Sequence, residues 1–239
     1  MPTGPEALIE APTPFGPVWF RTHDTGRPVL LFISGAFAPD DNAANLQDLI
    51  TGADVWRAHL PGNHAPRLIG ESLGLFVAAF DTAVRAALGD RPVVATGNST
   101  GALVALGLKA PNIRRLVLIE PPLRITPGGP FEAMRRDPRF NQDAFIDNIF
   151  GVGPQESTPR DYSHLLARLG PPAHVLIGGE PEAGAEAGPS VVDDLTRAEL
   201  QAHPRVRLYM VRGAGHQVLP HAPQTVADVM NRACREAFG

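Results

Sequence analysis

One stretch of the chain, VVATGNSTGALVAL at residues 93–106, constrains the fold more than any other. An apolar run typical of a buried strand leads into Gly97-Asn98-Ser99-Thr100-Gly101 and then into a run typical of a helix. A chain that turns from strand to helix within one residue strains that residue, and small neighbours allow strand and helix to pack closely. G-x-S-x-G in this setting predicts a nucleophilic serine, Ser99, at the carboxyl end of a strand.

The position expected for Ser99 also favours catalysis. Its hydroxyl would lie at the positive end of a helix dipole, and the Thr100 N–H would point at a developing oxyanion. The competing interpretation is a glycine-rich turn with an incidental serine. The strand before it and the helix after it favour the nucleophile.

Strand-like and helix-like segments alternate along the chain, which predicts a mostly parallel sheet with helices on both faces, an α/β fold. We expect a single domain over residues 1–239. About 50 residues, 121–170, separate two of the strands and contain helical pieces, so we interpret them as a lid inserted over one edge of the sheet. The expected strands are 18–21, 28–34, 55–59, 92–95, 116–119, 174–177 and 206–211, and the expected helices are 43–49, 72–88, 100–108, 131–136, 142–149, 191–202 and 223–237.

Composition narrows the possible partners. Lys and Arg total 21 against 25 Asp and Glu, a net charge of −4 without a long basic run, which argues against nucleic-acid binding. A single cysteine, Cys234, excludes an intrachain disulfide framework and favours a reducing compartment, so we expect a cytoplasmic protein. No uncharged run is long enough for a membrane span, and neither a metal site nor a cofactor motif is recognisable.

A second chemical group is expected from the segment VRGAGHQVLPHAP, residues 211–223. It begins at the end of an apolar strand and places His216 before the last helix. Imidazole titrates near neutral pH, so His216 could take the Ser99 proton and return it to a leaving group. His221 is the nearest rival, and a packing or capping role suits its position better.

Four segments in this order resemble the α/β-hydrolase fold family, and the resemblance covers nearly the whole chain from about residue 28. They are LLFISGAF (30–37), HLPGNHAPRL (59–68), the serine motif (93–106) and GAGH (213–216).

The resemblance implies a second N–H donor to the oxyanion. It also shows positions at which this chain differs from the family's usual residues. The family's first strand commonly ends in His-Gly, and the residue after it would supply an N–H, which here is that of Ala36. Ser34 stands in place of that histidine, His59 in place of a common aspartate, and Asn63-His64 where His-Gly is usual.

A triad also needs a carboxylate to orient the histidine, and several remain open. The family's Gly-x-x-Asp after the strand at 174–177 aligns with Gly-Glu-Pro-Glu at 179–182, which makes Glu182 the first choice and Glu180 the second.

Some members of the family instead place the acid after the strand that follows the nucleophile helix. This alternative corresponds to Glu120 in LVLIEPP. Asp193 and Asp194 are weaker candidates, because charges at the start of a helix complement its dipole.

The sequence thus predicts a serine hydrolase that acts on a small carboxylic ester, thioester or lactone. The same scaffold could perform carbon–carbon bond hydrolysis, acyl transfer or lyase chemistry, or bind a ligand without catalysis. Candidate apolar walls of its pocket in the lid are Phe131, Met134, Phe140, Phe145, Phe150 and Tyr162.

Overall fold

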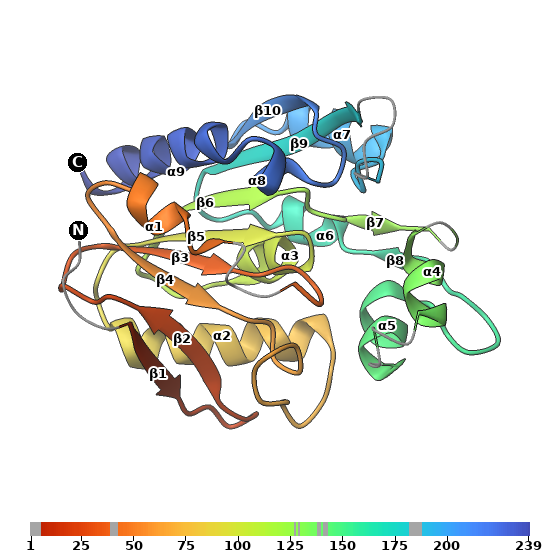
Figure 1. The fold of residues 1–239 in the computed structure, drawn as a ribbon, viewed down its shortest axis with the longest axis horizontal. Helices are drawn as coiled ribbons and strands as arrows, with labels where there is room; N and C mark the ends of the chain where they lie inside the picture. The colour runs from red at the N-terminus through yellow and green to blue at the C-terminus, as the bar shows by residue number, and fades with distance from the viewer. Residues whose placement is uncertain are drawn as a thin grey trace.

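The computed structural model describes residues 6–38, 43–126, 128, 130–137, 140, 143–181 and 188–239. These residues form an eight-stranded sheet in the order β1-β2-β4-β3-β5-β6-β9-β10, with helices on both faces (Figure 1). Strands β1 and β2 pair antiparallel, as do β2 and β4, and the remaining pairs are parallel. The expected α/β class and mostly parallel sheet are confirmed. The strands are β1 Ala7–Ala11, β2 Val18–Thr22, β3 Val29–Ile33, β4 Asp54–Ala58, β5 Val93–Asn98, β6 Ile113–Ile119, β9 Ala173–Pro181 and β10 Val206–Gly213.

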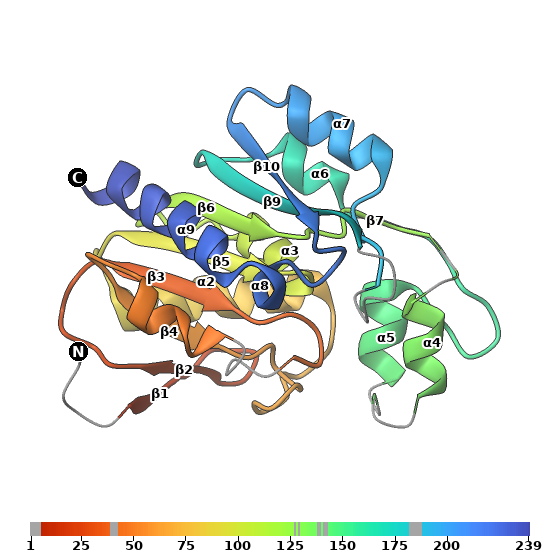
Figure 2. The same ribbon diagram turned by 45° about the horizontal axis from the view of Figure 1, so that its top comes forward.

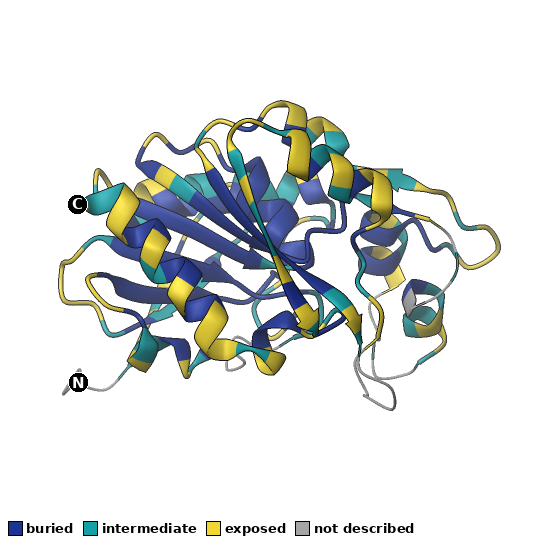
Figure 3. Ribbon diagram, turned by 90° about the horizontal axis from the view of Figure 1, so that it is seen from above, coloured by how far each residue is buried: buried dark blue, intermediate teal, exposed yellow. Residues whose placement is uncertain are grey.

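The central strands are continuous apolar runs because both of their faces are covered. In β3, Leu31 and Ile33 pack in the core beneath helices α2 and α3, whereas Leu30 and Phe32 pack beneath α1 and α9. Figure 3 shows the central strands buried between helices whose outer faces are exposed. The helices of these layers are α1 Leu46–Leu49, α2 Leu73–Leu88, α3 Thr100–Gly107, α6 Ser163–Ala167 and α9 Pro223–Phe238.

Helix α7 (Asp194–Ala202) packs on β10, and a short helix, α8 (Val218–His221), precedes α9. Asp193 caps α7 by accepting the amide of Thr196 at 2.6 Å, which confirms its expected role at the start of a helix. The sequence does not predict strand β1, because it is a largely exposed edge strand with weak apolar patterning.

The insertion after β6, which the sequence predicts to be a lid over one edge of the sheet, lies beyond the carboxyl ends of the strands (Figure 2). A two-stranded ribbon, β7 (Arg124–Ile125) and β8 (Arg160–Asp161), leads to helices α4 (Pro130–Arg136) and α5 (Asp143–Phe150). This placement puts the two helices at the end of the sheet where ligands bind in open α/β folds.

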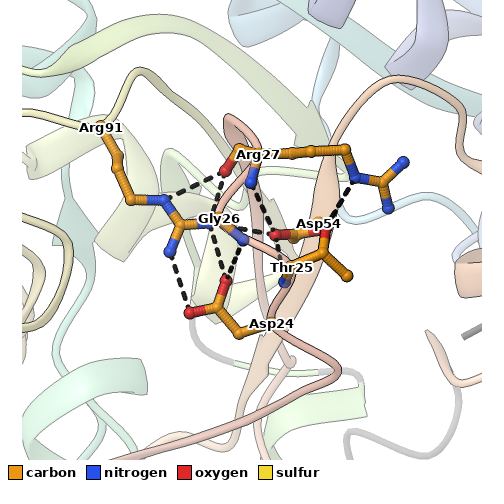
Figure 4. A network of polar contacts seen from close by, with 6 residues as sticks. All are labelled: Asp24, Thr25, Gly26, Arg27, Asp54 and Arg91. Atoms are coloured by element: carbon orange, nitrogen blue, oxygen red, sulfur yellow. Dashed lines mark hydrogen bonds and ion pairs between the residues drawn. The ribbon is translucent and has the colours of Figure 1, made fainter. Parts of the chain in front are cut away.

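A polar network lies at the opposite, amino-terminal end of the parallel strands (Figure 4). Asp54, at the start of β4, accepts hydrogen bonds from the amide and hydroxyl of Thr25, at 2.8 and 2.7 Å. The side chains of Arg27 and Arg91 approach the same carboxylate at 3.0 and 3.1 Å. The network joins the β2–β3 loop, β4 and the loop before β5 far from Ser99.

Candidate active site

Ser99 occupies the sharp turn between β5 and α3 that the sequence predicted. Its φ of +53° lies in the left-handed region, and its side chain is largely buried. A Cβ on Gly97 would lie 2.1 Å from the carbonyl oxygen of Gly101, and one on Gly101 would lie 2.3 Å from that of Ile33. Only glycine fits at either position, so these two residues allow the strand, the turn and the helix to close around Ser99.

His216 follows β10 at the same end of the sheet. Two glycines with positive φ, Gly213 and Gly215, turn the chain, and the His216 amide donates to the Gly188 carbonyl at 2.9 Å. Its Nδ1 lies 3.1 Å from Oε2 of Glu120. A carboxylate on Nδ1 fixes the tautomer and leaves Nε2 for proton exchange.

Glu120 directly follows β6 and is fully buried, with a φ of +51°. Its carboxylate accepts the amides of Gly178 and Val191, at 2.7 and 2.9 Å, and the Ser190 hydroxyl at 2.8 and 3.1 Å to its two oxygens. A buried carboxylate requires such partners, because removal from water is costly without them. These donors also hold one oxygen toward His216.

The three glutamates considered for the triad acid differ in how the structure places them relative to His216. Glu182, the first choice from the sequence, lies outside the described residues. Glu180 is exposed on β9, and Glu120, the alternative after the next strand, is the carboxylate in contact with His216.

The loop after β3 lies beside Ser99. A Cβ on Gly35 would lie 3.3 Å from the Asn98 carbonyl and 3.4 Å from Cβ of Ser99, so its backbone is tightly packed on the turn. Ala36 lines the same cavity as Ser99. Thr100 begins α3, and the amide of a first helical residue has no acceptor within the helix.

Ser34 and Asn63, two residues that depart from the family pattern, form hydrogen bonds that fix this loop. The Ser34 hydroxyl accepts the amide of Leu60 at 3.3 Å, and Oδ1 of Asn63 accepts the amide of Phe37 at 2.6 Å. Phe37 has a φ of +58°, a conformation that a bulky residue adopts only when its surroundings enforce it. The sequence marked Ser34 and Asn63 as unusual but did not reveal that they bind neighbouring backbone.

A cavity of about 450 Å³ opens above Ser99 and His216. Phe131, Met134, Phe140 and Phe150 of the lid region line it, as expected. Phe145 instead lies fully buried behind the wall, and the Tyr162 hydroxyl donates to the Ile149 carbonyl.

Within the described ranges, His, Cys, Asp and Glu do not gather in groups of three or more that could hold a metal ion. The same part of the chain has no helix with the length and apolar character needed to cross a bilayer.

A model described as the alpha/beta hydrolase family matches residues 30–229, so the chain belongs to that family. Carboxylesterase CesB from Bacillus subtilis is 13% identical with a TM-score of 0.69, over 97% of this chain and 92% of that one. An esterase from Thermogutta terrifontis is 16% identical with a TM-score of 0.69, over 99% of this chain and 100% of that one. A thioesterase domain from the curacin biosynthetic pathway is 15% identical with a TM-score of 0.66, over 95% and 99%. At such identities these likenesses establish the fold, and comparison with curated sequences gives no significant match.

Proposed function

We propose that this protein is a serine hydrolase that cleaves small carboxylic esters, thioesters or lactones, with Ser99, His216 and Glu120 as its triad. The observation that carries the proposal is the contact between Glu120 and His216 beside a strained serine turn. A buried acid, an oriented imidazole and a serine on one cavity are the groups that acyl transfer requires. The structural neighbours include esterases and a thioesterase domain, which supports the same reaction class.

In the proposed mechanism, Oγ of Ser99 attacks the substrate carbonyl while Nε2 of His216 accepts the serine proton. The amides of Thr100 and Ala36 bind the oxyanion. Collapse of this intermediate breaks the bond to the alcohol or thiol, which takes the proton from His216. Water then attacks the acyl-enzyme with His216 as base, releasing the acid and restoring Ser99. Glu120 stabilises the imidazolium at both steps.

Covalent labelling tests the nucleophile without a choice of substrate. Wild type, Ser99→Ala and His216→Ala are exposed to a small fluorophosphonate, and intact mass is measured. We expect one adduct on wild type, none on Ser99→Ala and much slower labelling of His216→Ala. A folded wild type that gains no adduct would contradict the proposal and favour a scaffold that binds a ligand without catalysis.

A further inference from the structure

The lid side of the cavity is a wall of aromatic rings. Phe131 and Phe150 have ring centroids 4.6 Å apart, and Phe37 and Phe140 have centroids 4.9 Å apart. Met134 of α4 completes the wall, which we call the lid wall. Such a surface favours apolar groups and offers little to a charged one.

The lid wall is anchored to the core through Phe145. This fully buried ring lies 5.2 Å from that of Phe37, 5.6 Å from that of Phe150 and 5.8 Å from that of Phe76 in α2. A continuous aromatic contact therefore joins α2, the lid helices and the loop beside Ser99. Because these rings support one another, the lid wall limits the size of a bound group rather than yielding to it.

Three described arginines of the insertion at 121–170 are bonded to groups outside the cavity. Arg135 donates to the Val152 carbonyl at 2.7 Å, and Arg160 donates to the Asp147 carbonyl at 2.9 Å. Arg124 makes two bonds with the Glu199 carboxylate of α7, at 2.9 and 2.7 Å. Among the described residues that line the cavity, only His216 has an acidic or basic side chain.

We propose, building on the function above, that the substrate is a neutral ester or thioester whose apolar group is compact and packs on the lid wall. The cavity of about 450 Å³ lies at the small end of the range for ligand pockets. A carboxylate placed on the lid wall would lose its hydration, and no described residue of that wall offers it a cationic partner. A long chain would exceed the space that the anchored rings leave.

A matched pair of substrates isolates the effect of charge. p-Nitrophenyl hexanoate and the mono-p-nitrophenyl ester of adipic acid have the same acyl length and differ in a terminal carboxylate. We expect kcat/KM to be lower for the adipate by roughly 50-fold or more. Equal rates within about threefold would overturn the proposal.

Chain length is varied in the same assay, with acetate, hexanoate, benzoate and dodecanoate esters. We expect a maximum at hexanoate or benzoate and at least a tenfold fall at dodecanoate. A rate that rises steadily to dodecanoate would overturn the size limit.

A variant then tests the lid wall directly. Met134→Arg introduces a cation on the wall and should narrow or reverse the preference for hexanoate over adipate, whereas Met134→Leu should leave it unchanged. An unchanged ratio in a Met134→Arg protein that folds would overturn the role of the wall. The wild-type comparison remains decisive if the variant does not fold.

Fluorophosphonate labelling separates this inference from the function on which it rests. Wild type that is labelled at Ser99 but cleaves no neutral ester of the panel contradicts the substrate class alone. Wild type that is neither labelled nor active contradicts the proposed function itself.

Discussion

The carboxylate of Glu120 lies 3.1 Å from Nδ1 of His216, although 96 residues separate them in the chain. Their strands are not neighbours, because β9 lies between β6 and β10. The loop to His216 therefore crosses β9 at Gly178, where a Cβ would lie 1.7 Å from the Gly215 carbonyl oxygen. The absence of a side chain at Gly178, together with the hydrogen bond that its amide donates to Glu120, allows the carboxylate and the imidazole to meet there.

Replacement of Glu120 by glutamine should test its assignment as the triad acid. The amide preserves the shape of the side chain but cannot stabilise an imidazolium, and it can hold the wrong tautomer. We expect kcat to fall by roughly 10³–10⁴-fold with little change in KM, measured with p-nitrophenyl hexanoate.

Two matched variants serve as controls for this measurement. Glu180→Gln changes an exposed carboxylate on β9, and Glu182→Gln changes the acid that sequence reasoning preferred. Both should retain activity near that of wild type. A large loss in Glu182→Gln together with an active Glu120→Gln would reverse the assignment.

Ser190 should act as a positioning residue through Glu120. Its hydroxyl donates to the carboxylate, and hydrogen bonds to charged groups contribute about 1.5–3 kcal/mol. We expect Ser190→Ala to lower kcat by about tenfold or more and Ser190→Thr to restore most of it.

A double-mutant cycle separates positioning from a general structural role. On a Glu120→Gln background, Ser190→Ala should cause little additional loss of kcat, because the group that it orients is already ineffective. Additive losses in kcat would argue that Ser190 acts independently of Glu120.

The sequence predicts where Ser99 and His216 lie because strand ends and tight turns leave local signals. Glycines at 97 and 101 are needed within a single turn, and the Gly-x-Gly-His segment directly follows its strand. The carboxylate that contacts His216 is harder to predict, since the sequence places three glutamates at or just after the ends of strands that finish at the same edge of the sheet. Of the two described glutamates, Glu120 reaches the imidazole because the loop that carries His216 crosses β9. That contact depends on long-range packing.

The difference between local signals and long-range contacts also explains why the contacts of the loop near Ala36 could not be predicted. Ser34 and Asn63 were visible as departures from a family pattern, but their partners lie 26 residues away in the chain in both cases. A local pattern cannot show that a side chain will bind the backbone of another loop. The lid helices were predicted from their periodicity, whereas their position beyond the strand ends depends on the β7–β8 ribbon.

Asn63 should control the proposed oxyanion loop. Its Oδ1 holds the Phe37 amide, and Phe37 directly follows Ala36. We expect Asn63→Ala to lower kcat by roughly 10-fold or more, as an oxyanion donor loses its position, with KM less affected. Asn63→Asp keeps the acceptor oxygen and should retain more activity than the alanine variant, so equal losses in the two would argue against this role.

Asp54 should make the folding stability of the protein sensitive to acid. Burial raises the pKa of Asp54, but hydrogen bonds from the hydroxyl and amide of Thr25 and from Arg27 favour the charged form, and the net effect is a pKa below its usual value. The Asp54 carboxylate therefore takes up a proton near pH 3.9 in the unfolded chain, whereas in the folded protein it stays charged to a lower pH. This stabilisation is complete above that pH and is lost as the pH falls toward the lowered pKa.

Asp54→Asn should reduce the free energy of unfolding at pH 7 by about 3 kcal/mol and flatten its decline below pH 4, as measured by urea denaturation. Asp24→Asn, at a more exposed carboxylate of the same network, should cost less than about 1 kcal/mol. An Asp54→Asn protein with the stability and acid slope of wild type would show that the network does not stabilise the fold.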